Sequence, residues 1–187
     1  MNGSLYLFPT CPEAAPDPAP VLAALEALQV AGTPLAETVG KRVFHAGEGF
    51  AREVIFAGCS PHLRFEAAHA NDRDFCHLAL HGPLPTPRLF TGPRTGRPRC
   101  PSCRARLDDW RERAVAPLST LPCPACEAAC RAIDLDWRQQ AAIGRLLVEL
   151  RNVFPGEATP SDRLLAALHK ATGIDWRYGW AAMSEAP

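Results

Sequence analysis

The sequence predicts an α+β protein in which a mixed sheet carries two short helices and a small cysteine-rich module is inserted between the halves of the chain. Three observations lead to this fold class. Short β-type segments separated by turn formers fill residues 42–81, leucines recur at helical spacing near both ends, and four cysteines form two close pairs between residues 100 and 126.

The composition is that of an ordinary folded domain. A chain of 187 residues is long enough for one compact domain with a small insertion. Hydrophobic residues make up 47% and charged residues 21%, which is too apolar for a disordered chain. Lys plus Arg and Asp plus Glu both number 20, so the whole chain has no electrostatic preference for nucleic acid or membrane.

The first elements are a strand and a helix. Residues Ser4 to Phe8 predict a short strand, and a proline-rich connection follows. Asp17 is the expected N-cap of a helix with Pro18 at its first position, and Gly32 is the expected stop. The apolar residues of this helix recur at helical spacing: Val21, Leu22, Leu25 and Leu28.

Short strands and a connector come next. Four strands are expected between residues 42 and 81: Val43–His45, Val54–Phe56, Leu63–Glu66 and Phe75–Leu80. Residues 82–101 are rich in Pro and Gly, so we expect a connector with neither strand nor helix there.

The last part of the chain predicts a strand, a helix and a strand. The apolar run Leu146–Leu150 is consistent with a strand or a short helix, and we favour the strand because a Pro-Gly turn closes it. Thr159 and Asp162 resemble a capping box with Pro160 at the first helical position. The helix carries a buried stripe and ends near Gly173, and alternating aromatics mark a terminal strand over residues 174–181. The stripe residues are Leu164, Leu165 and Leu168.

The two ends of the chain also resemble each other. Leu22–Leu25 and Leu165–Leu168 are both Leu-Ala-Ala-Leu, and a Glu-Ala loop with proline precedes each. A repeated strand–loop–helix unit would place both helices on one face of a shared sheet. Coincidence in an alanine-rich chain is the alternative. We divide the chain into an N-terminal half (1–97), a metal-binding module (98–135) and a C-terminal half (136–187) that completes the same domain.

The cysteine pairs carry the strongest chemical signal. Cys100 and Cys103 form one Cys-Pro-x-Cys motif, Cys123 and Cys126 form a second, and 19 residues separate them. Four thiolates suit tetrahedral Zn²⁺, and so small a module needs a metal to be stable. We predict one structural zinc ion with these four ligands. A redox pair or a catalytic zinc is less favoured, because two pairs occur and a catalytic zinc keeps one position open.

These motifs resemble those of zinc-ribbon and zinc-knuckle proteins, over residues 98 to about 130 only. In that family the four knuckle cysteines bind the metal, which implies Cys100, Cys103, Cys123 and Cys126 here. The family usually places glycine after the second cysteine of each knuckle, where the chain is left-handed. This chain has Arg104 and Glu127 there. A helix that begins at Cys126 would instead give a treble-clef-like module.

Other cysteines and histidines give weaker signals. Cys59, His62, Cys76 and His77, with His69 and His81 nearby, are candidates for a second metal or catalytic site, although surface or strand positions are the favoured interpretation. Cys130 lies four residues after Cys126. We expect a buried thiol there rather than a substitute ligand or a redox sensor.

The leading hypothesis is a cytoplasmic zinc-binding protein, not an enzyme, whose structural zinc stiffens a surface for a protein partner. No segment resembles an export signal, no apolar run could span a membrane, and no known catalytic motif occurs. One alternative is nucleic-acid binding through the arginines of residues 88–113, for which a solvated charged face is the favoured interpretation. The other is an enzyme that uses His62, His77 or Cys76 in a cleft. The strip arginines are Arg88, Arg94, Arg97, Arg99, Arg104, Arg106, Arg111 and Arg113.

Overall fold

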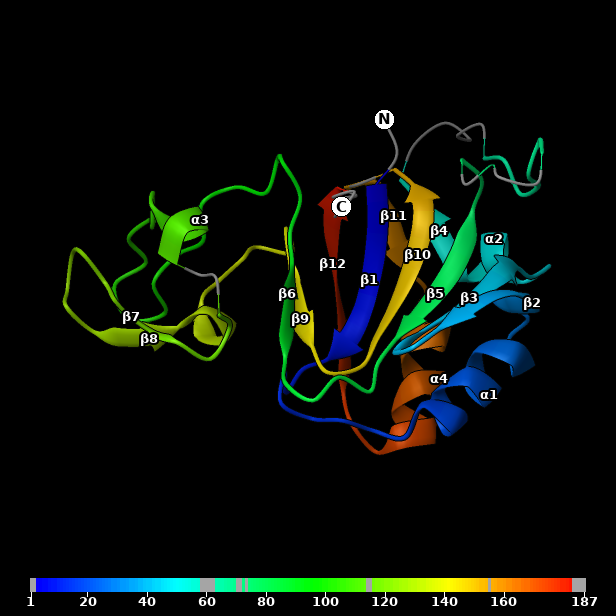
Figure 1. Ribbon diagram of the computed structural model, residues 1–187, viewed down its shortest axis with the longest axis horizontal. Coiled ribbons are helices and arrows are strands. Elements are labelled where there is room, and N and C mark those ends of the chain that lie inside the picture. The colour runs from blue at the N-terminus through cyan, green and yellow to red at the C-terminus, as the bar shows by residue number, and fades with distance from the viewer. Residues whose placement is uncertain are drawn as a thin grey trace.

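The computed structural model describes residues 3–57, 63–69, 72, 74–113, 116–154 and 156–182. Figure 1 shows a six-stranded sheet with two helices on one side of the view and a smaller module on the other, with strands β6 and β9 between them. The fold class is therefore α+β, as the sequence predicts. No helix of the described residues is long and apolar enough to cross a membrane.

The main sheet is antiparallel throughout. Its strands, in spatial order, are β12 (Trp176–Ala182), β1 (Gly3–Pro9), β10 (Leu147–Val153), β5 (His77–His81), β3 (Lys41–Ala46) and β2 (Ala31–Thr38). Every neighbouring pair is antiparallel, so the expected mixed sheet is wrong in this respect.

The connections explain the absence of parallel pairs. Helix α1 (Pro18–Ala27) lies between β1 and β5 in the chain, and β1 and β5 flank β10 in the sheet. Helix α4 (Asp162–Thr172) joins β10 to β12 by way of β11, and these two strands flank β1. Each β-α-β unit is thus split by a strand of the other, which is the ferredoxin-like topology. The β2–β3 hairpin extends this sheet beyond β5, and the module is inserted between β5 and β10.

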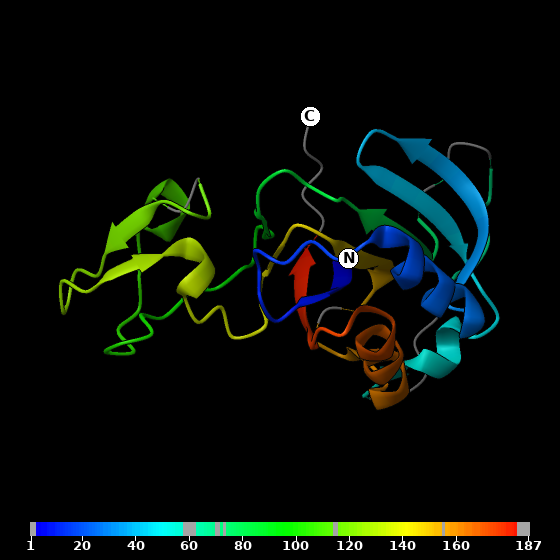
Figure 2. The ribbon, with the colours of Figure 1, turned by 90° about the horizontal axis from the view of Figure 1, so that it is seen from below.

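Both helices cover the same face of the sheet, as the internal resemblance predicts (Figure 2). Leu25 of α1 and Leu168 of α4 are fully buried in one core, while Leu22 and Leu165 pack at its margin. The two Leu-Ala-Ala-Leu segments therefore have the same pattern of burial. The sheet residues of this core include Leu5, Leu7, Leu78, Leu80, Val148 and Leu150.

The helix ends differ from two expectations. Asp17 caps α1 by accepting from the backbone N–H of Ala19 at 2.9 Å, but the helix ends at Ala27 rather than at Gly32. Gln29 turns the chain with a φ of 56°, and Gly32 already belongs to β2. Helix α4 is capped by Ser161. The expected capping box is wrong because its first residues belong to β11 (Ala158–Pro160), which pairs with β4 (Val54–Phe56). Gly173 ends α4 in the left-handed conformation, as expected.

Most expected strands are present. The exception is Leu63–Glu66, which has no strand. In addition, the expectation that residues 82–101 contain no strand is wrong, because β6 (Arg88–Phe90) lies there and pairs with β9 (Ala142–Gly144). The backbone N–H of Cys76 does bond to the carbonyl of Arg64, but Leu63 and Phe65 contribute mainly by packing against the core. The paired strands β6 and β9 cover part of the second sheet face, where Phe90 packs against the cluster that contains Tyr6 and Phe8. A short helix, α2 (Phe50–Glu53), precedes β4.

The module has a hydrophobic cluster separate from the sheet core, and this cluster continues beyond residue 135 to Trp137, Ala141 and Ile143. The module contains α3 (Trp110–Arg113), β7 (Thr120–Pro122), β8 (Ala129–Arg131) and a 3-10 turn at Ala132–Asp134. The rings of Trp110 and Trp137 meet edge to face at 5.0 Å between centroids, and Cys100 and Cys123 are buried in the same cluster. The cysteine pairs thus lie beside the module's apolar core.

A glycine allows the chain that leaves the module to pack against β12. A Cβ at Gly179 would lie 2.5 Å from the carbonyl oxygen of Ala141, whereas a Cβ at Gly144 would meet nothing closer than 3.5 Å. We expect Gly179→Ala to lower the free energy of unfolding by about 1–3 kcal/mol, because backbone must move to admit the methyl group. Gly144→Ala, the matched control, is expected to change it by less than about 0.5 kcal/mol. Urea unfolding checks both; equal values for the two variants would contradict the close approach.

Candidate metal centre and a buried polar cluster

The first cysteine pair lies on a tight turn. The backbone N–H of Arg104 bonds to the carbonyl of Cys100 at 3.0 Å, and the N–H of Cys100 bonds to the carbonyl of Ala105 at 2.9 Å. This turn leaves Cys100 buried and Cys103 exposed.

The second pair repeats this geometry. The N–H of Glu127 bonds to the carbonyl of Cys123, and the N–H of Cys123 bonds to the carbonyl of Ala128, both at 2.9 Å. Strand β8 follows, so the alternative of a helix that begins at Cys126 is wrong. The strands β7 and β8 pair on either side of this turn.

Both turns contain a left-handed residue where glycine is usual. Arg104 has a φ of 65° and Glu127 a φ of 59°. A side chain costs roughly 1–2 kcal/mol in this conformation, and such strain persists only where surrounding contacts enforce it. Arg104 and Glu127 therefore adopt the left-handed conformation that glycine usually supplies at these positions, so the turns keep their shape without glycine.

The two turns bring four sulfur atoms together. All four Sγ atoms lie within 4.8 Å of one another. Cys100 Sγ lies 3.8 Å from Cys126 Sγ, and Cys103 Sγ lies 3.7 Å from Cys123 Sγ. A tetrahedron with metal–sulfur bonds of about 2.3 Å has edges of about 3.8 Å. The cluster can therefore hold a metal ion.

Backbone amides favour the thiolate form of the two buried cysteines. Hydrogen bonds from the N–H groups of Cys103 and Ser102 outweigh burial and lower the pKa of Cys100 to about 6. The N–H of Ala125 contributes most to lowering the pKa of Cys123. Because the thiolate is the form that binds metal, these donors suit a ligand site.

Cys130 lies outside the group of four. Its thiol is buried and donates weakly to the carbonyl of Ala128 at 3.4 Å. Burial raises the pKa of Cys130 to about 11. These features match the expected buried thiol.

Several strip arginines serve the module's own structure. Arg97 pairs with Asp108 and Arg104 with Asp136, both at 3.0 Å. Arg111 donates to three backbone carbonyls of the preceding connector and lies 4.3 Å from the centroid of Trp110. These contacts use side chains that a nucleic-acid strip would need free.

The proposed second cluster of cysteine and histidine does not form from its described members. Cys59 and His62 lie outside the described residues. Cys76 is buried in the core on the helix side of the sheet, whereas His77, next along the strand, lies on the other face. A shared site of Cys76 and His77 is therefore wrong.

The second sheet face instead carries a buried carboxylate that the sequence analysis missed. Glu149 on β10 is 1% exposed. Its Oε1 accepts from Ser4 Oγ at 2.7 Å and from the Tyr6 hydroxyl at 2.9 Å. Its Oε2 lies 2.6 Å from His81 Nε2 and 2.9 Å from Arg151 Nε, whose N–H points elsewhere, so this last contact is an ion pair. We call these five residues the Glu149 cluster.

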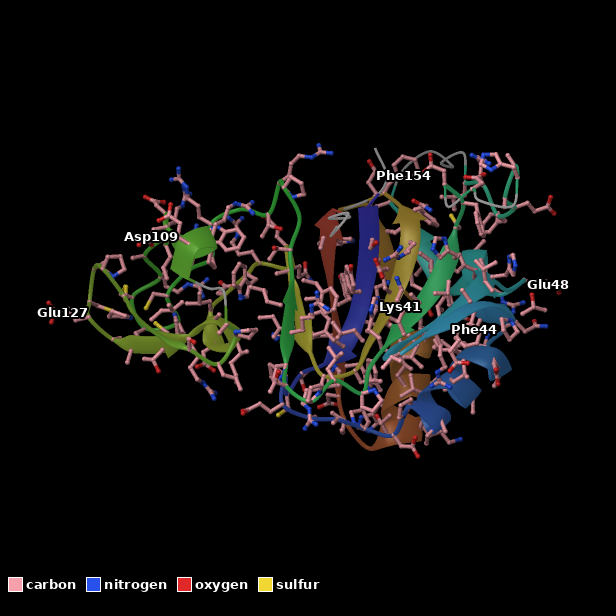
Figure 3. All side chains as sticks on the ribbon, in the orientation of Figure 1. Lys41, Phe44, Glu48, Asp109, Glu127 and Phe154 are labelled. Carbon is pink, nitrogen blue, oxygen red and sulfur yellow. The ribbon has the colours of Figure 1, made fainter. Side chains whose placement is uncertain are left out.

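The cluster keeps Glu149 charged despite its burial. Burial alone would raise the pKa of Glu149, but the hydrogen bond from His81 and the charge of Arg151 outweigh it and lower the pKa to about 2. Burial, with the nearby Glu149 charge, raises the pKa of Tyr6, which stays a protonated donor. Lys41, labelled in Figure 3, is paired with His81 in the sheet, and burial followed by the charge of Arg151 lowers the pKa of Lys41.

The one sequence signal for this cluster was a carboxylate inside an apolar run, Leu-Leu-Val-Glu-Leu. Alternation along β10 puts Glu149 and Arg151 on the face opposite Val148 and Leu150. The hydrogen-bonding partners of Glu149, which are Ser4, Tyr6 and His81, come from β1 and β5, which are remote in sequence. The arrangement fixes the His81 ring through a carboxylate, as in many sites where imidazole is a base or a ligand.

Comparison of the chain with protein-family models, with curated proteins and with solved structures finds no match.

Replacing the buried carboxylate tests the electrostatics of the cluster. We expect Glu149→Gln to lower the free energy of unfolding by about 3 kcal/mol, because Arg151 loses a buried counter-charge. The pKa of Glu149 is about 2 when folded against 4.5 for the ordinary group, so its contribution is present above about pH 4.5 and is lost as the pH falls toward 2. Urea unfolding across this range should show a weaker pH dependence for the variant.

Glu48→Gln is the matched control, since Glu48 is exposed. It should keep the native pH dependence and change stability by less than about 0.5 kcal/mol. A Glu149→Gln protein as stable as the control at pH 7 would contradict a charged, paired Glu149.

Proposed function

We propose that the protein binds one structural Zn²⁺ through Cys100, Cys103, Cys123 and Cys126 in a zinc-ribbon-like module. The observation that carries the proposal is the pair of matching turns with sulfur–sulfur distances of 3.7 and 3.8 Å, close to the edge of a ZnS₄ tetrahedron. Four thiolates fill the coordination shell of zinc, which leaves no open position for chemistry.

The metal has a structural task in this proposal. The module's apolar cluster is small, and four thiolates without a cation would repel one another. We therefore propose that residues 98–135 form a unit whose folding depends on the metal, while the sheet keeps its separate core. Free thiols in all described cysteines suit a reducing compartment, and we propose the cytoplasm.

We further propose that the metal-stiffened module is a binding surface for a protein partner. Support comes from its position: Glu127 at one end of the molecule marks the tip of the module, and Glu48 lies at the opposite end (Figure 3). The module lies apart from the main sheet, so its surface is accessible to a partner (Figure 1).

Metal analysis tests the first part. Purified protein should contain about one zinc per chain, and Cys123→Ser should weaken zinc affinity by at least about 100-fold, since even outer-shell partners contribute 10–100-fold. Elemental analysis and a chromogenic chelator measure this directly. Cys11→Ser is the control, because Cys11 is an exposed thiol outside the cluster.

Wild-type protein that takes up no zinc would contradict the proposal. Stoichiometric iron with visible absorption would identify the other metal that an S₄ tetrahedron accepts, and would contradict the assignment of zinc. Chelation should open residues 98–135 to protease and leave the sheet protected.

Affinity capture combined with gel filtration tests the second part. Zinc-loaded protein should form a complex of defined stoichiometry with a protein partner, and Cys123→Ser or chelation should abolish it, because the surface loses its fixed shape. The Cys11→Ser protein should retain the complex. A stable monomer that captures no partner would count against this role.

A further inference from the structure

The second face of the main sheet carries partly exposed polar side chains at the Glu149 cluster. Helices α1 and α4 both pack on the other face (Figure 2). Lys41 on β3 lies opposite His81 on β5, and alternation puts Val43 on the same face as Lys41. The side chains of His81 and Arg151 are 13% and 20% exposed. A molecule from solution can therefore reach this part of the face.

Arg151 carries a buried donor that lacks an acceptor. Its Nε lies 2.9 Å from Glu149 Oε2, but the N–H does not point at that oxygen. This nitrogen is among the buried side-chain polar atoms of the described residues that have no hydrogen-bond partner. The two terminal amino groups of Arg151 also have no acceptor within the described residues, and they are not buried. Buried donors without an acceptor are rare in proteins, and a bound water or ion commonly satisfies them.

His81 presents a ring nitrogen at the same place. Its Nε2 is held by Glu149 Oε2 at 2.6 Å, which fixes the orientation of the ring. Nδ1, the other ring nitrogen, has no hydrogen-bond partner in the described parts of the chain and is not buried. Because His81 Nε2 and Arg151 Nε both contact the same oxygen of Glu149, the imidazole and the guanidinium are close neighbours. A ligand on Arg151 can therefore also contact His81.

An anion from solution would satisfy the remaining donors of Arg151. Each oxygen of Glu149 already contacts two side chains, so this carboxylate has no capacity left for them. Lys41 adds positive charge nearby, since burial, followed by the charge of Arg151, lowers the pKa of Lys41. Arg151 and Lys41 together exceed the charge of Glu149 by one, which a ligand with a single negative charge would balance. A doubly charged ligand such as phosphate would be repelled more strongly by the buried Glu149.

Apolar surface borders these charges. The ring of Phe90 lies 5.3 Å from the ring of His81 between centroids, and Phe90 is partly exposed. Val43, two residues after Lys41 in β3, is also partly exposed. A ligand whose charged group contacts Arg151 can therefore pack its apolar part against Phe90 and His81, in the usual combination of apolar lining with a few polar groups.

We propose that this face binds a small organic acid, with its carboxylate on the guanidinium of Arg151 and its apolar part against Phe90 and the His81 ring. The planar guanidinium pairs with a carboxylate through two parallel hydrogen bonds, and such charge-assisted pairs are the strong ones. Glu149 acts as a positioning residue, because it holds both the imidazole and the guanidinium. The buried carboxylate thus has a task that an apolar side chain at residue 149 could not perform.

The inference goes beyond the proposed zinc binding, and its residues lie on the main sheet. Its test uses full-length protein of measured zinc content, so failure to bind the acid and failure to hold zinc are separate results. Isothermal titration calorimetry with sodium benzoate gives the affinity. Benzamide, which has the same ring without the charge, should bind at least about tenfold more weakly, because it loses the charge-assisted pair.

Arg151→Gln should weaken benzoate binding at least about tenfold, because hydrogen bonds to a charged group are among the strongest. Arg52→Gln removes the same charge from the exposed surface of α2 and should change affinity less than threefold. Nuclear magnetic resonance of the wild-type protein decides the matter if Arg151→Gln unfolds. The ring signals of His81 should move and saturate with benzoate, while those of His169, exposed on α4, should stay unchanged.

Three results would overturn the proposal: no saturable binding of benzoate by the wild-type protein, equal affinities for benzoate and benzamide, or equal losses for Arg151→Gln and Arg52→Gln. Binding that leaves the His81 signals unchanged would place the acid elsewhere and would also overturn it. Inorganic phosphate should compete only at concentrations at least about tenfold higher than benzoate, because of repulsion by Glu149. Phosphate that binds more tightly than benzoate would overturn the assignment to a carboxylate.

Discussion

The antiparallel pairing of β1 with β10 is the contact on which the other layers of this protein depend. It joins residues more than 140 positions apart, as the Ser4–Glu149 separation of 145 shows. On one side of this pair, Leu5, Leu7, Val148 and Leu150 form the floor on which both helices pack. On the other side, the same two strands bring the hydroxyls of Ser4 and Tyr6 to the carboxylate of Glu149.

The two faces of the β1–β10 pair require different kinds of side chain. The helix side is satisfied by apolar volume and tolerates many side chains of similar size. The other side holds a charge that requires named donors at fixed distances, because an unpaired buried carboxylate costs several kcal/mol. The fold thus keeps a general core on one face and a specific polar arrangement on the other. Such arrangements occur often where a protein binds or transforms a ligand.

Local signals were predictable from the sequence, whereas long-range ones were not. The two Cys-x-x-Cys pairs, the Asp17 cap and the Gly173 stop depend on neighbours within a few residues, and the structure shows each feature. Strand β2 was missed because Gly32 and Pro34 are typical turn residues, and its pairing with β3 overrides that preference. The Thr159 cap was wrong because pairing with β4 keeps Thr159 extended. Ser4, Tyr6 and His81, which hydrogen-bond to Glu149, lie on two other strands, so no sequence window contained them.

The chain segments that lead into and out of the module pair with each other, which separates the module from the main sheet. Arg99 and Asp136 exchange both backbone hydrogen bonds, at 2.9 and 3.0 Å, directly before Cys100. The cysteine-bearing segment is therefore a loop whose two ends are held together by backbone hydrogen bonds. Ordering the inside of this loop adds little to the loop-closure entropy that the main sheet costs. Such an appendage could be lost, lengthened or exchanged between lineages with a short turn in its place, while the ferredoxin-like sheet stays whole.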